Sequence, residues 1–332
     1  MTKILLDKLF IGKTLNKKEA KDLMMNLSMN KINKTQAISI ISIYNMRYPT
    51  LEEVTGFRQA IMELSMKINL SEFNAVDIVG TGGDGKNTFN ISTLACFIVA
   101  GTGEKVIKHG SFNSSSITGS SNILKELGYN FSNKEETLKN QLDKVGLCYL
   151  HAPIFHPIIN IMSSVRKELG LRTIFNTLGP LVNPVNPKNQ LLGVNNLELA
   201  RIYYYFYQNM ENNYAIVHSL DGHDEITLTS DIKYYSPEGE HFYSLEELEI
   251  NKKVKVNPHE LKGGKNTKEN VRIFISVLSG EGTLSQNEVV LINATFALCL
   301  LNKDSIENNY DKAKHSLKSG KAKNILKKLL RL

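Results

Sequence analysis

The sequence is poor in cysteine and has no long apolar run. Its three cysteines, Cys96, Cys148 and Cys299, lie far apart in apolar surroundings, so neither a disulfide framework nor a CxxC metal or redox motif is available. We expect buried thiols in a reducing compartment. No apolar stretch approaches the roughly 20 residues that cross a bilayer. Asp7 and Lys8 interrupt the first apolar run, so no secretory signal is expected. These absences predict a cytoplasmic protein with no membrane partner.

Internal repeats, low-complexity segments and disordered linkers are also absent from the 332 residues. A content of 42% hydrophobic and 22% charged residues is that of an ordinary globular protein and excludes collagenous, mucin-like and disordered classes. The 40 Lys and Arg exceed the 33 Asp and Glu, which gives a net charge of +7. This excess favours anionic ligands, such as phosphates, nucleic acid or acidic metabolites, but does not choose among them.

The first part of the chain has the apolar spacing of helices. From Ile4 to about Asn69, apolar residues recur three or four positions apart, which predicts a helical layer. Thr50 followed by Glu53 is a capping box that starts one of these helices, and Pro49 ends the segment before it. No strand is expected before Ala75.

From Ala75 onward, short apolar runs alternate with amphipathic segments, as in a parallel sheet with crossover helices. The predicted strands are 75–79, 105–109, 147–151, 190–194 and 214–219. The predicted helices are 93–101, 120–128, 134–145 and 197–209, followed by shorter polar strands, helices at 271–278 and 287–301, and a lysine-rich helical tail. The fold class is therefore α/β, with a mainly helical N-terminal lobe, a larger lobe with a mostly parallel central sheet, and a ligand cleft between them.

A glycine-rich loop follows the first predicted strand and matches three motifs. Gly80, Gly82 and Gly85 fit the dinucleotide pattern G-x-G-x-x-G, but the next strand ends in Lys108-His109, where that motif requires an acidic residue for the ribose. The phosphate-binding loop of nucleotide hydrolases fits incompletely, because Asn87 stands where Ser or Thr would bind magnesium.

The third interpretation treats the whole string GTGGDGKNTFNIST as a diphosphate cradle. Its glycines allow close backbone approach, and amides before the helix near Thr93 face the anion. Asn90, Ser92 and Thr93 supply side-chain donors. A simple turn needs only one or two glycines, so an anion-binding role is favoured.

Three further groups accompany this loop. Lys108 and His109 precede a hydroxyl-rich run from Ser111 to Ser121, whose hydroxyls can bind phosphate oxygens. Asp224 and Glu225 form an adjacent acidic pair, and hard carboxylates opposite a diphosphate loop are what magnesium requires.

These strings together, GTGGDGKNTFNIST, KHG with its serine-rich sequel, VRKELGLRTIFNTLGPLVNP and DGHDE, resemble the anthranilate phosphoribosyltransferase family over nearly the whole chain. The resemblance implies transfer of phosphoribose from 5-phosphoribosyl 1-diphosphate to the amine of anthranilate, in tryptophan biosynthesis. It implies a fold like that of the nucleoside phosphorylases and, for a relative of this kind, a homodimer. It also implies a helical domain at 1–70, joined by part of 160–190, and a phosphoribosyl diphosphate-binding domain at 71–332.

The resemblance further implies the site residues. Those for phosphoribosyl diphosphate are Gly80, Gly82, Gly83, Asp84, Thr88, Asn90, Ser92, Thr93, Lys108, Ser116 and Ser120. Those for anthranilate are Gly80, His109, Ser111, Arg166 and Gly179. Two magnesium ions per active site would be held by Ser92, Asp224 and Glu225. The sequence departs from the family at Ser111, where Asn is usual, and at Phe112. No residue is assigned as general acid or base.

Two histidines and a tyrosine run have simpler interpretations. His151 and His156 lack an HExxH context, so zinc is not expected. His156 would be either a wall of the acceptor tunnel or a core residue whose hydrogen bonds are satisfied. The tyrosines from Tyr203 to Tyr207 are expected to pack on a helix.

Three rival functions remain open. A pyrimidine nucleoside phosphorylase would share the fold but needs a single phosphate site, and the acidic pair argues against it. A noncatalytic relative could bind nucleic acid through a basic groove, but it would need neither GTGGD nor DGHDE. A nucleotide hydrolase ranks last because of Asn87. We therefore expect two small-molecule substrates and no nucleic acid.

Overall fold

The helical start of the chain is built from capped amphipathic helices. The computed structural model describes residues 2–112, 117–248, 250 and 254–332. Thr50 and Glu53 form the predicted capping box, and Asn16 and Asn33 cap two other helices in the same way. These helices are α1 (Thr2–Phe10), α2 (Lys17–Ser28), α3 (Lys34–Met46) and α4 (Leu51–Glu63).

A single mixed sheet forms the centre of the molecule. Within the described residues its order is β3-β2-β1-β4-β5-β6-β7. The first five of these pair in parallel, and β6 and β7 continue the sheet in antiparallel fashion. The strands are β1 (Ala75–Gly80), β2 (Lys105–Gly110), β3 (Leu147–His151), β4 (Asn189–Gly193), β5 (Asn213–Ser219), β6 (Ile232–Ser236) and β7 (Gly239–Tyr243). The predicted α/β class with a mostly parallel sheet is confirmed.

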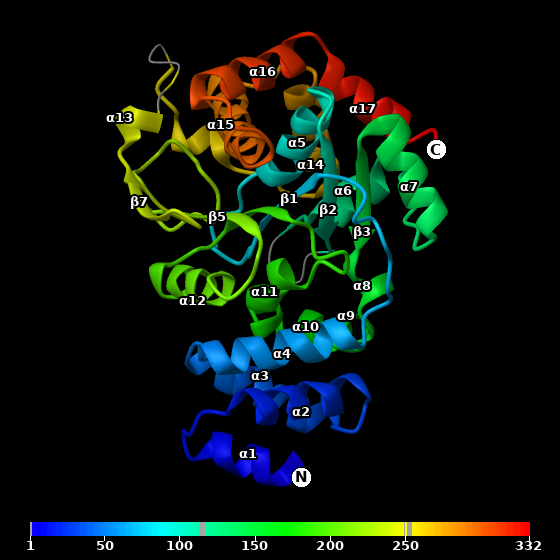
Figure 1. Cartoon of the computed structure of the whole chain (residues 1–332), viewed down its shortest axis with the longest axis vertical. Coiled ribbons are helices and arrows are strands. Elements are labelled where there is room, and N and C mark those ends of the chain that lie inside the picture. Colours follow the sequence, from blue (N-terminus) through cyan, green and yellow to red (C-terminus); the bar gives the residue numbers. More distant parts are fainter. Residues whose placement is uncertain (1, 113–116, 249, 251–253) are drawn as a thin grey trace.

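Helices cover both faces of this sheet (Figure 1). On one face lie α5 (Ile91–Gly101), α14 (Thr267–Leu278), α15 (Leu284–Leu301), α16 (Ile306–Lys318) and α17 (Lys321–Leu329). On the other lie α12 (Leu197–Tyr207), the four N-terminal helices, and the short helices α8 (Ala152–Phe155), α9 (Pro157–Ile161), α10 (Ser163–Leu169) and α11 (Ile174–Leu178). The remaining elements are α6 (Ser120–Glu126), α7 (Glu135–Val145), α13 (Leu245–Leu248) and two 3-10 helices, η1 (Gly179–Val182) and η2 (Pro258–Leu261).

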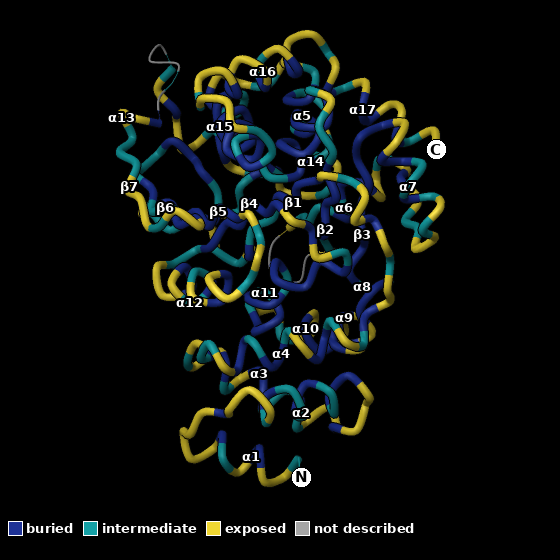
Figure 2. The backbone as a smooth tube through the Cα atoms, in the orientation of Figure 1, coloured by how far each residue is buried: buried dark blue, intermediate teal, exposed yellow. Residues whose placement is uncertain are grey.

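Two large apolar cores follow from this layering, and the central strands between them are buried over most of their length (Figure 2). In the second core, side chains of the N-terminal helices pack with residues between Ala152 and Val182. The division into a helical domain of 1–70 with part of 160–190 and an α/β domain of 71–332 stays a prediction.

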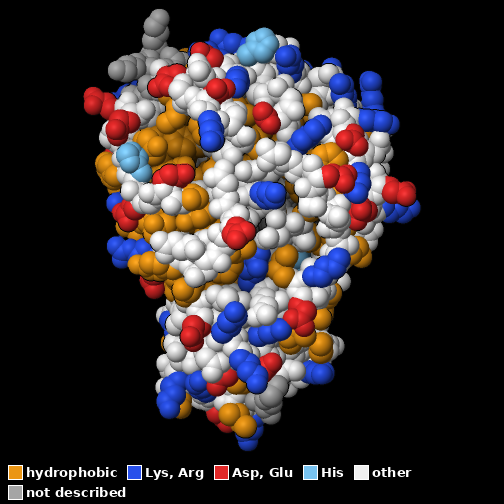
Figure 3. All heavy atoms as spheres, viewed as in Figure 1, with side chains coloured by type: hydrophobic (Ala, Val, Ile, Leu, Met, Phe, Trp, Pro, Cys, Tyr) orange, Lys and Arg blue, Asp and Glu red, His pale blue; other side chains and the backbone are white. Residues whose placement is uncertain are grey.

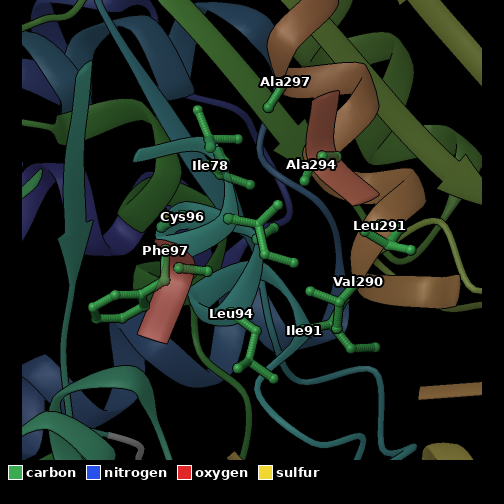
Figure 4. Close-up of a cluster of buried hydrophobic side chains, with 14 of the residues drawn as sticks. Ile78, Ile91, Leu94, Cys96, Phe97, Val290, Leu291, Ala294 and Ala297 are labelled. Atoms are coloured by element: carbon green, nitrogen blue, oxygen red, sulfur yellow. The ribbon is translucent and has the colours of Figure 1, made fainter. Parts of the chain in front are cut away.

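The longest helix of the described residues, α15, is mostly apolar and mostly buried. Among the described residues it is the one helix long and apolar enough to cross a membrane, but 72% of it is buried inside the fold. Figure 4 shows its Val290, Leu291 and Ala294 near side chains of α5, such as Ile91 and Leu94. Its apolar surface is thus used in the core. The sequence-based helix was three residues too short, because Thr283 caps the first turn.

The thiols are only partly as predicted. Cys96 and Cys148 are buried, but Cys299 is half-buried, so that part of the prediction was wrong. On the molecular face in Figure 3, lysine and arginine side chains are interspersed with acidic ones, and no continuous basic stripe crosses it.

Candidate active site

A cavity of about 680 Å³ opens at the carboxyl ends of the central strands. The chain runs from β1 outward to β2 and β3 and then returns to the other side of β1 with β4. In open α/β sheets, such a reversal leaves a crevice in which ligands bind. The cavity contains every predicted site residue that the structure describes: Gly80, Gly82, Gly83, Asp84, Thr88, Asn90, Ser92, Thr93, Lys108, His109, Ser111, Ser120, Arg166, Gly179, Asp224 and Glu225. Ser116 lies outside the described residues.

The glycine loop leaves β1 in a conformation that few side chains permit. Gly82 has φ +62°, in the left-handed region, and its amide donates a 2.6 Å hydrogen bond to Asp224 Oδ2. A Cβ added at Gly80 would lie 2.3 Å from the same oxygen. The loop and the acidic residue therefore depend on each other for their positions.

The acidic pair is attached to the glycine loop and to the start of α5. Glu225 accepts a 3.0 Å hydrogen bond from the Ser92 amide and a 3.4 Å hydrogen bond from Thr88 Oγ1. Burial and the nearby Asp84 carboxylate raise the pKa of Asp224 to about 7. Burial and the charge of Asp224 raise the pKa of Glu225 well above its usual range. Mutual repulsion of these carboxylates is what a divalent cation would relieve.

Asp84 provides a second indication of a cation. Its Oδ1 accepts the Lys86 amide, but its buried Oδ2 has no hydrogen-bond partner among the described residues. No group of three His, Cys, Asp or Glu side chains forms a complete metal cage in the described part of the chain. The donors present fit magnesium, which takes one or two carboxylates and completes its shell with water and substrate oxygens.

Lys108 and His109 end β2 beside the loop, and both are buried. Lys108 Nζ donates a 2.7 Å hydrogen bond to the Ile78 carbonyl, and the His109 amide donates one of 3.2 Å to Asp77. Burial, followed by the neighbouring His156, lowers the pKa of His109 well below its usual value. His109 is therefore neutral at pH 7, and its ring faces the cavity without a charge.

The far end of the cavity combines one positively charged side chain with an apolar wall. Arg166 comes from α10 and is 9% exposed, and its guanidinium carbon lies 5.6 Å from the centre of the Phe175 ring. Burial lowers its pKa to about 10, so it stays charged at pH 7. The wall residues are Ala152, Ile159, Phe175, Pro180 and Val182. Such a pocket suits a flat aromatic acid, because an arginine fork matches a carboxylate.

Sequence reasoning missed several of these positions. Pro153, Pro157 and Gly170 break the segment into short helices, and no periodicity identified its apolar wall. Arg172 also escaped notice, although its side chain packs against Gly83, where an added Cβ would lie 3.2 Å from it. His156 is not a wall of the cavity. It is buried next to His109, with the ring centroids 5.3 Å apart, so it is a core residue; neither of its ring nitrogens has a hydrogen-bond partner among the described residues, so the expectation that its hydrogen bonds are satisfied was wrong.

The tyrosine run after β4 packs only in part as predicted: Tyr203 and Tyr207 are buried and make hydrogen bonds, whereas Tyr205 is exposed. Tyr203 donates to the Thr177 carbonyl, and Tyr207 donates at 2.8 Å to Gln190 Oε1. Tyr203 thereby links α12 to the segment that carries Gly179 at the cavity.

The fold and this cavity define a glycosyl transferase: the family model described as "Glycosyl transferase family, a/b domain" matches residues 72–323. The anthranilate phosphoribosyltransferase of Flavobacterium psychrophilum is 47% identical over 330 residues, 99% of each chain, and that of Bacteroides fragilis is 44% identical over 331 residues. The chain therefore belongs to the anthranilate phosphoribosyltransferase family, and the family prediction is confirmed.

Solved structures agree with this assignment. Anthranilate phosphoribosyltransferase from Thermus thermophilus has a TM-score of 0.87 at 29% identity, covering 99% of both chains. The protein from Saccharomyces cerevisiae in complex with PRPP and Mg has a TM-score of 0.88 at 26% identity, covering 99% of this chain and 97% of that one.

Proposed function

We propose that this chain transfers the phosphoribosyl group from 5-phosphoribosyl 1-diphosphate to the amine of anthranilate. The products are N-(5-phosphoribosyl)anthranilate and diphosphate, and the step belongs to tryptophan biosynthesis. One observation carries the proposal: a glycine loop, a carboxylate pair and a buried arginine with an apolar wall line the same cavity. Relatives of that name, including one in complex with PRPP and Mg, support it.

The donor would occupy the strand-end half of the cavity. The glycine loop offers backbone amides to the diphosphate, and hydroxyl and amide side chains surround the remaining phosphate oxygens. The proposed donor residues are Gly80, Gly82, Gly83, Asp84, Thr88, Asn90, Ser92, Thr93, Lys108, Ser116 and Ser120. Lys108 contributes its charge from a buried position in β2, where its ammonium group donates a hydrogen bond to the Ile78 carbonyl.

Asp224, Glu225 and Ser92 would hold magnesium, with two ions per site. When bound, magnesium neutralises charge on the diphosphate and so makes it a better leaving group. The amides of Gly82 and Ser92 donate hydrogen bonds to the two carboxylates and so hold their orientation. The protein thus needs little rearrangement to receive the metal.

Anthranilate would bind at the other half, with its carboxylate on Arg166 and its ring against the apolar wall. His109, Ser111, Gly179 and Gly80 would complete this subsite. Ser111 presents a hydroxyl where the family usually has an amide. The amine of anthranilate is neutral and nucleophilic at pH 7, so orientation and charge stabilisation carry the reaction and no general base is assigned.

The rival functions fit the cavity less well. A nucleoside phosphorylase has one phosphate to bind and no use for the carboxylate pair. Neither a glycine loop nor that pair would serve a nucleic-acid binder. We also propose a homodimer, a cytoplasmic location, and the two-domain division at 1–70 with part of 160–190 and at 71–332.

The test is loss of anthranilate fluorescence with 5-phosphoribosyl 1-diphosphate and magnesium, with each component omitted in turn. Signal loss that requires all three supports the transferase. Donor binding by calorimetry without turnover would redirect the proposal to another acceptor, and no donor binding would reject it.

The metal assignment has its own variant. Asp224→Asn with Glu225→Gln should reduce turnover most at low magnesium while leaving the far-UV circular dichroism unchanged. An unaltered magnesium titration would remove the pair from the metal site.

A further inference from the structure

A continuous row of hydrogen-bonding side chains runs from the cavity into the core behind it. Ser120 Oγ lies 2.7 Å from the Tyr149 hydroxyl, and Ser121 Oγ lies 2.7 Å from the same hydroxyl. Ser121 Oγ also lies 2.8 Å from His151 Nδ1. The row is therefore Ser120, Tyr149, Ser121 and His151, and we call it the hydroxyl row.

Only one end of the hydroxyl row reaches the cavity. Ser120 lines it, whereas Tyr149, Ser121 and His151 are at most 5% exposed. The His151 ring stacks on Phe131 with centroids 4.4 Å apart and meets the edge of Phe112 at 4.6 Å. This aromatic packing fixes the ring, so His151 offers Nδ1 to Ser121 in one orientation.

The backbone leaves room for this arrangement at one glycine. A Cβ added at Gly110 would lie 2.3 Å from the Tyr149 hydroxyl and 2.4 Å from Ser120 Oγ. The end of β2, which also carries Lys108 and His109, therefore leaves space for the Ser120 and Tyr149 hydroxyls because Gly110 has no side chain.

Hydrogen counting allows the row two directions. Each hydroxyl donates one hydrogen and accepts others, and a neutral imidazole donates from one nitrogen only. If His151 Nδ1 accepts, the hydrogens of all three hydroxyls point toward the histidine, and Ser120 has none for the cavity. If Nδ1 donates, Ser121 is free to donate to Tyr149 and Tyr149 to Ser120, and in that arrangement the hydrogen of Ser120 points into the cavity.

An anionic oxygen in the cavity distinguishes these directions. Ser120 Oγ is repelled by a phosphoryl oxygen unless it donates a hydrogen to it, and such charge-assisted bonds are about twice as strong as neutral ones. We propose that Tyr149, Ser121 and His151 are positioning residues for the phosphoribosyl donor: His151 protonated at Nδ1 orients the row, so that Ser120 donates to a phosphoryl oxygen. This inference rests on the proposed function.

The imidazole is neutral in this state. Burial, with a smaller contribution from the charge of Lys125, lowers the pKa of His151 to about 4. A neutral ring has two tautomers: a proton on Nε2 leaves Nδ1 to accept and turns all three hydroxyls toward the histidine, whereas a proton on Nδ1 permits the opposite direction.

The first test is ¹⁵N nuclear magnetic resonance of the full chain labelled at histidine. The His151 signals are assigned by their disappearance in His151→Phe, which keeps a ring between Phe112 and Phe131. With saturating 5-phosphoribosyl 1-diphosphate and magnesium, we expect His151 to carry its proton on Nδ1. A proton on Nε2 in that complex would overturn the proposal.

The second test is a double-mutant cycle on donor binding. Ser120→Ala, Tyr149→Phe and Ser121→Ala should each raise the donor Kd and KM about fivefold, the effect of one hydrogen bond, with kcat changed less than about twofold. Because Tyr149 acts through Ser120, adding Tyr149→Phe to Ser120→Ala should cause no further loss. Additive losses would overturn the proposal that Tyr149 acts through Ser120.

Tyr129→Phe is the matched control. Its hydroxyl is also buried and belongs to the same aromatic cluster, with ring centroids 6.2 Å from Tyr149, but it donates to Gln141. Its removal should leave the donor Kd unchanged, and a fivefold loss would show general damage instead of positioning. If the wild-type chain binds the donor and the losses in the double-mutant cycle are additive, only the proposed role of the hydroxyl row is rejected. A wild-type chain that binds no donor rejects the proposed function as well.

Discussion

Gly80→Ala should damage the active site far more than its size suggests. The added Cβ would lie 2.3 Å from Asp224 Oδ2 and 3.1 Å from the Asp224 carbonyl oxygen. Carbon and oxygen atoms in contact stand near 3.4 Å, so the carboxylate must move by about 1 Å. That movement breaks its 2.6 Å hydrogen bond from the Gly82 amide.

Two magnitudes follow from this displacement. A hydrogen bond to a charged group contributes about 1.5–3 kcal/mol, so we expect the free energy of unfolding to fall by about 2 kcal/mol. A misplacement of about 1 Å at a reacting centre costs about 100-fold in rate. The kcat/KM of the variant should therefore fall about 100-fold. The magnesium concentration that gives half-maximal activity should rise.

The assays are anthranilate fluorescence across a magnesium titration and urea unfolding followed by circular dichroism. Gly179→Ala is the comparison, because Gly179 lines the same cavity but has no atom within 4 Å of an added Cβ. It should keep the donor Kd and the magnesium dependence and alter at most the acceptor KM. The reasoning is refuted if Gly80→Ala stays within about threefold of wild type.

Three further predictions concern stability and reactivity. Burial lowers the pKa of His156 to about 4. As the pH falls below 6.5, His156 is therefore protonated in the unfolded chain but not in the folded one, which destabilises the folded state. Urea titrations from pH 7 to 5 should show wild type losing about 2 kcal/mol more than His156→Phe, and equal losses would contradict this. Glu53→Ala removes a buried carboxylate that pairs with the part-buried Arg47 and accepts hydrogen bonds from Leu15 and Tyr44, and it should cost about 3 kcal/mol by urea unfolding without changing the donor Kd. Burial raises the pKa of the Cys96 thiol to about 12 and also raises that of Cys148. A thiol reagent should modify both only in denaturant, after Cys299, and prompt modification of all three would refute their burial.

Local patterns in the sequence predicted most of the fold. The capping box at Thr50 and the alternation after Ala75 are each set by neighbours a few residues apart, and both appear where expected. The start of α14 was placed four residues late, because Asn266 caps a polar first turn that apolar spacing does not reveal.

Contacts across the fold could not be predicted in this way. Asp224 and Gly82 are 142 positions apart, and their hydrogen bond depends on which strands end at the same edge of the sheet. The motif resemblance brought both residues into the predicted site, but it did not give their dependence on each other. Arg172 had no motif, and its place against Gly83 arises only from packing.

The order of chain synthesis has a consequence for the helix that follows the glycine loop. Almost every residue of α5 is buried, and its cover comes from α14 to α17, which are synthesised after the glycine loop and both acidic residues. A nascent chain that already contains the glycine loop and both acidic residues still exposes this apolar helix to water. Truncations within α16 or α17 should therefore abolish donor binding although neither helix lines the cavity, and the incomplete chain should bind chaperones until α17 has emerged from the ribosome.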